Sequence, residues 1–239
     1  MAFKTHGALC TVLMLAACGS PQPRPAAPGA PAAPAAPAAA CAVDAGQSEI
    51  RLLVYRAGPM ARLGHNHVIV NREVSGWVDP RAGSAGGSFS LRVPVAAFMV
   101  DDRQARGEEG PDFPQDVSDD ARTGTRHNML SAAVLDADRF PIIALSSIAI
   151  EPVAAPGGAA PAGDSRMATV NIEVAGHESR VAIPFTVVRS PGRILASGTA
   201  TLRQSGLGLT PLAVMLGALQ VQDEFTVKFR VLCAEPTGS

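Results

Sequence analysis

The sequence predicts an all-β domain of about eight antiparallel strands, closed as a barrel or packed as a sandwich, with one or two short helices. Apolar residues recur at every second position in five segments between residues 50 and 231. Most of these apolar residues are Val and Ile, which pack well on pleated sheets, together with Leu and Phe. The sequence has no long helical pattern, which leaves antiparallel strands as the main predicted element.

Each alternating segment has one apolar face and one polar, solvent-exposed face, as in an antiparallel sheet that covers a core on one side. Further strands fit residues 67–79, 141–150 and 193–203, and residues 175–178 have the composition of a tight hairpin turn. Closure of the sheet would remove unpaired edge strands. The five alternating segments are residues 50–55, 88–95, 169–174, 181–187 and 224–231.

Two regions break the alternation. Residues 101–126 are rich in Asp, Glu, Arg and Gly and predict a long exposed crossing loop. Their acidic residues do not have the spacing of an EF-hand calcium loop. Short helices are predicted over residues 127–138 and 210–219.

The N-terminal segment predicts secretion and lipidation. Lys4 precedes a short apolar run over residues 7–17, which is typical of a signal peptide rather than a membrane span. The sequence LAAC, residues 15–18, resembles the bacterial lipobox, which implies removal of residues 1–17 and diacylation of Cys18. Gly19 and Ser20 follow in place of Asp, so we expect an outer-membrane lipoprotein that faces the periplasm.

The chain after this signal divides into two parts. Residues 18–40 are dominated by Pro and Ala and predict a semi-rigid tether, whereas residues 41–235 form the folded domain. Cys41 and Cys233 bracket that domain, and the first and last strands of a closed up-and-down barrel can be neighbours. A disulfide between these two cysteines is therefore expected in an oxidising compartment.

Composition and motifs argue against several functions. The formal net charge is −1, so charge does not indicate a nucleic-acid partner. Aromatic residues, on which the bases of single-stranded nucleic acids stack, make up only 4% of the chain. The sequence contains no nucleophile elbow, zinc-protease motif or phosphate-binding loop. We therefore assign no catalytic residue, expect no enzyme activity and predict no cofactor.

His65 and His67 form the most suggestive local cluster. On a strand, residues two apart face the same way, so the two imidazoles could ligate a metal with His127 or a loop carboxylate as third ligand. They could equally bond the backbone or the head of a ligand at a strand start. Because nothing in the sequence fixes a third ligand, we assign no metal site, and a metal-binding or redox-linked surface protein is the alternative function.

Residues 43–233 resemble the YceI-like family of periplasmic, lipocalin-like barrels over essentially the whole folded region. The resemblance is based on the order and spacing of several motifs. The sequence departs from the family pattern at two points: Gly206 replaces an Asp of one family motif, and the family histidine aligns with Met129 or Asn128. The motifs are VDAGQSEI (43–50), RHNML (126–130), LDADRFP (135–141), a serine at 146 or 147, the hairpin 174–184 and QSGLGL (204–209).

The resemblance implies a non-enzymatic barrel that holds a polyisoprenoid or other amphiphilic lipid. Phe185, Phe225, Val227 and Phe229 occupy the apolar phase of two regular strands and are the expected interior residues. Polar contacts at the mouth are expected from His65, His67, Arg126 and His127. An eight-stranded barrel can instead be filled by its own side chains, and the sequence leaves that alternative open.

Overall fold

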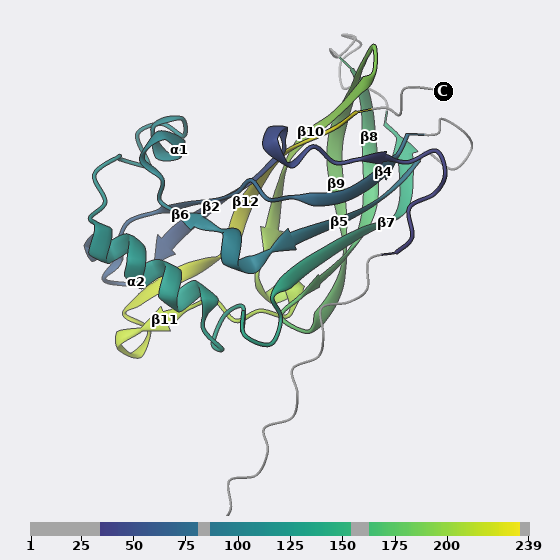
Figure 1. Cartoon of the computed structure of the whole chain (residues 1–239). Helices are drawn as coiled ribbons and strands as arrows, with labels where there is room; N and C mark the ends of the chain where they lie inside the picture. The colour runs from purple at the N-terminus through teal and green to yellow at the C-terminus, as the bar shows by residue number, and fades with distance from the viewer. Residues whose placement is uncertain (1–33, 81–86, 154–162, 235–239) are drawn as a thin grey trace, which may run out of the picture.

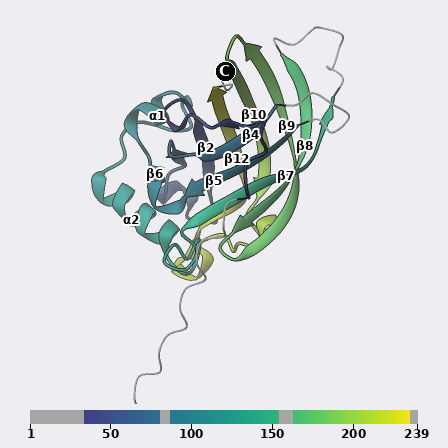
Figure 2. The same cartoon turned by 45° about the vertical axis from the view of Figure 1, so that its right-hand side comes forward.

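The chain forms one strongly curled antiparallel sheet with two short α-helices beside it (Figures 1 and 2). The structure is a computed structural model that describes residues 34–80, 87–153 and 163–234. It confirms the all-β, lipocalin-like class. The helices are α1 (Arg103–Gly107) and α2 (Asp119–Leu130). The strands are β1 (Cys41–Ala42), β2 (Glu49–Ala57), β3 (His67–Asn71), β4 (Ser75–Asp79), β5 (Ser88–Pro94), β6 (Met99–Val100), β7 (Ile142–Pro152), β8 (Asp164–Val174), β9 (His177–Ser190), β10 (Arg193–Arg203), β11 (Ala213–Val214) and β12 (Leu219–Ala234).

The sheet curls until its two ends approach one another. The strand order is β1-β4-β5-β7-β8-β9-β10-β12-β2-β3-β6, with β11 beside β12. Strands β3 and β4 lie near opposite ends of this order, yet only residues 72–74 connect them. A single bridge between Val43 and Cys233 also joins the β1 end to β12. These links give the sheet its barrel-like closure.

Asn71 explains why residues 67–79, expected as one strand, form two. Its side-chain oxygen accepts a hydrogen bond from the amide of Glu73 at 2.9 Å. Asn side chains favour local turns closed by such a bond over a continued strand. Its Nδ2 donates to the carbonyl of Pro94 at 2.8 Å, so this fully buried side chain is satisfied on both sides. The chain therefore leaves β3 at one end of the sheet and enters β4 at the other.

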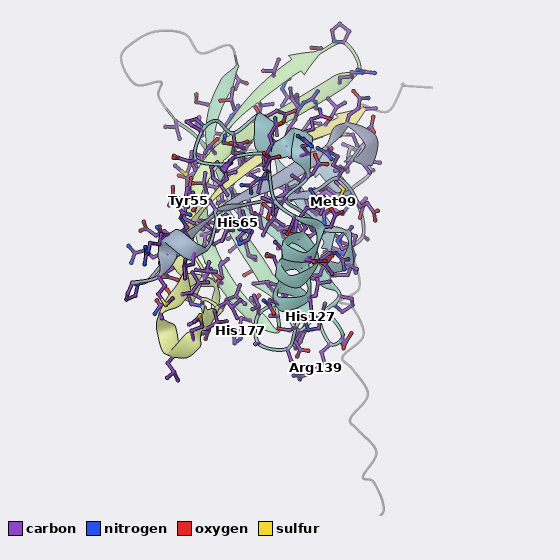
Figure 3. All side chains as sticks on the ribbon, turned by 90° about the vertical axis from the view of Figure 1, so that its left-hand side faces the viewer. Tyr55, His65, Met99, His127, Arg139 and His177 are labelled. Carbon is purple, nitrogen blue, oxygen red and sulfur yellow. A yellow bond between two sulfur atoms is a disulfide. The ribbon has the colours of Figure 1, made fainter. Side chains whose placement is uncertain are left out.

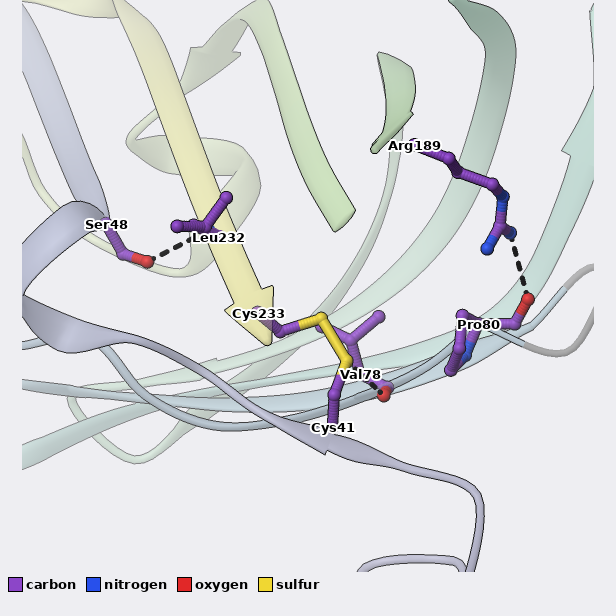
Figure 4. Close-up of a disulfide and its surroundings, with 7 residues drawn as sticks. All are labelled: Cys41, Ser48, Val78, Pro80, Arg189, Leu232 and Cys233. Carbon is purple, nitrogen blue, oxygen red and sulfur yellow. Dashed lines mark hydrogen bonds between the residues drawn. A yellow bond between two sulfur atoms is a disulfide. The ribbon is translucent and has the colours of Figure 1, made fainter. Parts of the chain in front are cut away.

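A disulfide joins Cys41 of β1 to Cys233 of β12 (Figure 4). The two Cα atoms lie 5.7 Å apart, within the usual range for a bridged pair, and both residues are buried. Beside the bridge, the Leu232 amide donates to Ser48 Oγ at 3.0 Å and the Asp44 amide donates to the Leu232 carbonyl at 2.8 Å. The first and last strands are thus held together covalently and by hydrogen bonds.

The expectation of a long exposed loop over residues 101–126 is only partly right, because most of these residues are exposed but the segment is partly helical and is anchored by buried side chains. This segment contains α1 and the first part of α2, and Asp101, Ala105, Arg106 and Phe113 are buried. Ala105 and Phe113 pack with apolar residues on the outer face of β2 and β3, and in β2 this is the face that the alternation had marked as solvent-exposed. The outer-face residues of this cluster are Leu53, Val68 and Val70, with Tyr55 partly buried against them.

The two helices predicted from sequence are also placed differently. Helix α2 begins after Ser118, whose Oγ accepts a hydrogen bond from the Ala121 amide, and it ends at Leu130, so residues 127–138 are helical only at their start. Residues 210–219 form β11 and a single 3₁₀ turn, Met215–Gly217. The predicted hairpin turn is present, with Ala175 and Gly176 both at positive φ between β8 and β9.

The end of the expected tether contacts the sheet. The indole Nε1 of Trp77 donates to the Pro34 carbonyl at 3.1 Å. The expected signal peptide and Cys18 lie outside the described residues. Within the described part of the chain, no helix combines the length and apolar character needed to cross a membrane.

We expect the disulfide to contribute at most about 5 kcal/mol to the free energy of unfolding, because the bridge closes a long loop in the unfolded chain. The test is urea unfolding of the chain carrying Cys10→Ser and Cys18→Ser, with and without reductant. Reduction should lower the midpoint in this protein and leave it unchanged after Cys41→Ser and Cys233→Ser are added. Two reactive thiols in the oxidised, unfolded protein would contradict the bridge.

Candidate functional site

The curled sheet encloses a cavity of about 580 Å³. Native cores leave few voids larger than a water molecule, whereas ligand pockets commonly reach this volume. The barrel is therefore not filled by its own side chains. Inward-facing residues of six long strands line most of the wall, including Leu52, Leu91, Leu145, Ile172, Leu202 and Val227.

Three of the four predicted interior residues line this cavity. Phe225, Val227 and Phe229 project into it from β12. Phe185 faces inward from β9 but lines an adjoining cavity of about 110 Å³, toward the disulfide, which it shares with Phe229. The period-two alternation thus identified the inner face of both strands, although it could not show which part of the interior each residue reaches.

Helix α2 closes part of the cavity, but through residues other than the predicted ones. Ala121, Gly124, Thr125 and Asn128 line the cavity, a spacing that places them on one helical face. Arg126 and His127 lie on other faces and do not line it, and Arg126 donates to the Ala96 carbonyl at 2.6 Å. The structure therefore does not place Arg126 and His127 in the cavity wall, from which polar contacts at the mouth were expected.

One end of the cavity has an apolar rim. The rim consists of the turn before β3 and the 3₁₀ turn between β11 and β12, which are joined where the Met60 amide donates to the Ala218 carbonyl at 2.8 Å. Leu63 and Val214 line the cavity from these turns, although Leu63 is 63% exposed. Met215 and Leu216 beside them are also exposed, with Leu216 wholly in solvent.

Polar side chains in the cavity wall gather near this rim. Tyr55 and Arg56 come from the end of β2, His65 and His67 from the start of β3, and Gln220 from the facing part of β12. No Asp or Glu of the described residues lines the cavity. This end therefore offers hydrogen-bond donors and cations, whereas the remaining wall is mostly apolar.

His65, labelled in Figure 3, and His67 lie against Asp101, a residue that sequence reasoning placed in an exposed loop. The Nδ1 atom of His67 is 2.7 Å from Asp101 Oδ2, and Nε2 of His65 is 3.4 Å from the same oxygen. The two rings meet edge to face with centroids 4.5 Å apart. The predicted histidine pair thus shares one buried carboxylate.

Asp101 is held from its other side by Arg106 of α1. Its Oδ1 accepts hydrogen bonds from the Val68 amide at 2.9 Å and from Arg106 Nη1 at 2.5 Å. Arg106 is fully buried and also donates to the carbonyls of Asn66 and Pro114. Burial opposes ionisation of Asp101, but its contacts with His65, His67 and the Val68 amide hold its pKa well below the usual range.

Sequence reasoning missed Asp101 and Arg106 because their segment is polar and its partners are distant along the chain. One signal was available: Phe113 is a large apolar residue within a run of charged and small residues. An apolar anchor of this kind indicates that a loop folds back onto the sheet, as Phe113 does against Tyr55.

The comparisons with known proteins show the fold. No protein-family model matches the chain, and no curated protein matches it. BcnA of Burkholderia cenocepacia is similar in structure, with a TM-score of 0.53, 17% sequence identity and coverage of 80% of this chain and 99% of BcnA.

Two further solved structures are similar. A polyisoprenoid-binding domain from Saccharophagus degradans gives a TM-score of 0.52 at 13% identity, with 83% of this chain and 99% of that domain covered. A YceI protein of Campylobacter jejuni gives a TM-score of 0.46 at 12% identity, with 68% and 81% covered. The fold is shown by the first two similarities: this chain has the same barrel-like fold as BcnA and the polyisoprenoid-binding domain.

Proposed function

We propose that this protein binds one amphiphilic lipid of the polyisoprenoid class in its cavity and catalyses no reaction on it. The observation that carries the proposal is an apolar cavity of about 580 Å³ that the protein's own side chains leave unfilled. Aliphatic cavities do not hold water well, because water finds too few polar partners there. An apolar chain is the matching occupant.

Burial of such a chain supplies the affinity. Each methylene group removed from water contributes about 0.8 kcal/mol, so about ten buried methylenes contribute on the order of 8 kcal/mol. Loss of ligand freedom offsets part of that gain. Val and Leu dominate the wall, with Phe225 and Phe229 on β12, so most of the cavity suits a flexible aliphatic chain rather than a polar ligand.

The polar end suits a neutral or anionic head. Tyr55, Arg56, His65 and Gln220 can donate hydrogen bonds, and no carboxylate of the described wall would repel an anion. The exposed rim residues Leu63 and Leu216 support entry of a lipid at this end, because exposed apolar residues lower the cost of transfer from a membrane. The polyisoprenoid-binding domain from Saccharophagus degradans shares this fold, which supports the ligand class.

We further propose that the protein acts at the cell envelope, anchored through lipidated Cys18. The lipobox-like sequence at residues 15–18 supports this location, and two acyl chains suffice for stable membrane attachment. A Pro- and Ala-rich segment between the anchor and the sheet would let the cavity mouth reach the membrane surface or a partner.

The first test is identification of a bound lipid. The full chain carrying Cys18→Ser, expressed in a bacterial host and purified without detergent, should release about one isoprenoid or other long-chain lipid per protein on extraction with organic solvent. Mass spectrometry identifies the lipid, and uptake of a fluorescent polyprenol measures its affinity. A wild-type protein that contains no lipid and takes up none of the probe would contradict the proposal.

The substitution Val227→Phe tests whether the barrel interior is a cavity or a packed core. The larger ring projects into the cavity, so the free energy of unfolding should change by less than the roughly 1–3 kcal/mol typical of overpacking. Excluding about two methylenes of ligand should weaken polyprenol binding about tenfold. The matched control is Val70→Phe in the packed outer cluster, which should lose about 1–3 kcal/mol of stability while any remaining folded protein binds normally. Equal destabilisation by both changes would indicate a filled barrel.

Cys18→Ser tests the anchor. The variant should move from the membrane fraction to the soluble fraction, because covalent acyl chains supply the attachment. Mass spectrometry of the mature wild-type N-terminus should find a diacylated cysteine. Retention of the unlipidated variant in the membrane fraction would show that another part of the protein provides the attachment.

A further inference from the structure

Beyond lipid binding, we propose that His65, His67 and Asp101 form a site for one divalent transition-metal ion in the cavity wall. The ligand atoms of these three residues all lie within 4.8 Å of one another. They come from two segments that are distant in the sequence: the start of β3 and the turn between β6 and α1. Nothing in the proposed lipid chemistry requires this convergence.

The distances fit a shared ion. Two ligands that bind zinc at about 2.1 Å with tetrahedral angles lie about 3.4 Å apart. The separation of His65 Nε2 and Asp101 Oδ2 is 3.4 Å. His67 Nδ1 is closer to Oδ2, at 2.7 Å, the length of a hydrogen bond. An ion would replace the proton between these two atoms and require them to separate by about 0.7 Å.

His65 carries the clearest sign of a missing ligand. Its Nε2 atom is buried and has no hydrogen-bond partner of good geometry. Buried polar atoms without a partner are rare in native structures. The atom points to the shared Oδ2 of Asp101, and coordination of an ion between them would satisfy it.

The surroundings fix Asp101 in the orientation that a ligand needs. The Val68 amide and Arg106 both donate to Oδ1, which leaves Oδ2 for the histidines. Hydrogen-bonded carboxylates of this kind are the usual outer shell of a metal site. The segment that carries the histidines is also held, because Asn66 accepts a hydrogen bond from the Arg56 amide and donates one to the Asp112 carbonyl.

The donor set selects the class of ion. Two imidazole nitrogens and one carboxylate oxygen suit Zn²⁺, Co²⁺, Fe²⁺, Ni²⁺ or Cu²⁺, whereas Ca²⁺ and Mg²⁺ prefer oxygen ligands alone. Arg106 already balances the charge of Asp101, so a bound ion would leave the site positive. A positive site favours hydroxide or an anionic head group at the remaining coordination position. That position faces the cavity, because both histidines line it.

The test uses Co²⁺ and Zn²⁺ with the full chain carrying Cys10→Ser and Cys18→Ser, purified without a histidine tag. Co²⁺ absorption should show one ion per chain with nitrogen and oxygen ligands, and Zn²⁺ should displace it. His65→Gln and His67→Gln should each weaken binding more than about tenfold, since loss of even an outer-shell partner costs 10- to 100-fold. His127→Gln, an exposed histidine on α2, is the matched control and should bind as the parent does.

These variants retain the buried Asp101–Arg106 pair, whereas Asp101→Asn would leave Arg106 without its counter-charge and threaten the fold. Circular dichroism should show that both histidine variants are folded. Val227→Phe should weaken lipid uptake without changing Co²⁺ affinity, which keeps this proposal separate from lipid binding. Equal Co²⁺ affinity in the parent and in the His65→Gln/His67→Gln double variant would overturn the metal site, whatever the result for lipid.

Discussion

The interior of the curled sheet is larger than its own side chains fill, and the structure depends on how the ends of the sheet are held around that space. Dispersion contacts across a packed core normally hold facing strands together, and a cavity removes part of them. Here the ends are joined by other means: the Cys41–Cys233 disulfide, the buried Asn71 turn and the bridge from Val43 to Cys233. A covalent bridge is well suited to holding closed a barrel whose interior is not filled by its own side chains.

The outer face of β2 and β3 supplies packing that the interior lacks. Leu53, Val68 and Val70 pack there against Ala105 and Phe113, so these strands are buried on both sides. Nearby, Glu109 accepts from both Arg51 and Lys228, and these contacts hold its pKa below the usual value although burial opposes this. The buried residues Asp101, Ala105, Arg106 and Phe113 therefore anchor the segment from Asp101 to Phe113 to the sheet, and its position brings Asp101 to the histidines.

Sequence periodicity predicted the structural features that are determined by residues close together in the sequence. It identified most of the long strands, the 175–178 turn and the inward positions Phe225, Val227 and Phe229, because a strand's two faces follow directly from its alternation. It could not identify contacts between distant segments. The two buried faces of β2, the cavity-facing side of α2 and the convergence of Asp101 on His65 and His67 all depend on how the 101–126 segment folds back. Local composition made that segment look like solvated loop.

The two proposed sites share structural elements, which has a physical consequence. His67 begins β3, and Ile69 on the same strand lines the cavity two residues further on. Arg106 donates hydrogen bonds to both Asp101 and the Asn66 carbonyl, so one side chain links the carboxylate to the segment that carries the histidines. If an ion and a lipid head group both bind here, each must change the affinity of the other by the same factor, because coupling between sites is reciprocal. An anionic head group bound to the ion would make that coupling favourable, since it would balance the positive charge that Arg106 and the ion leave in the wall.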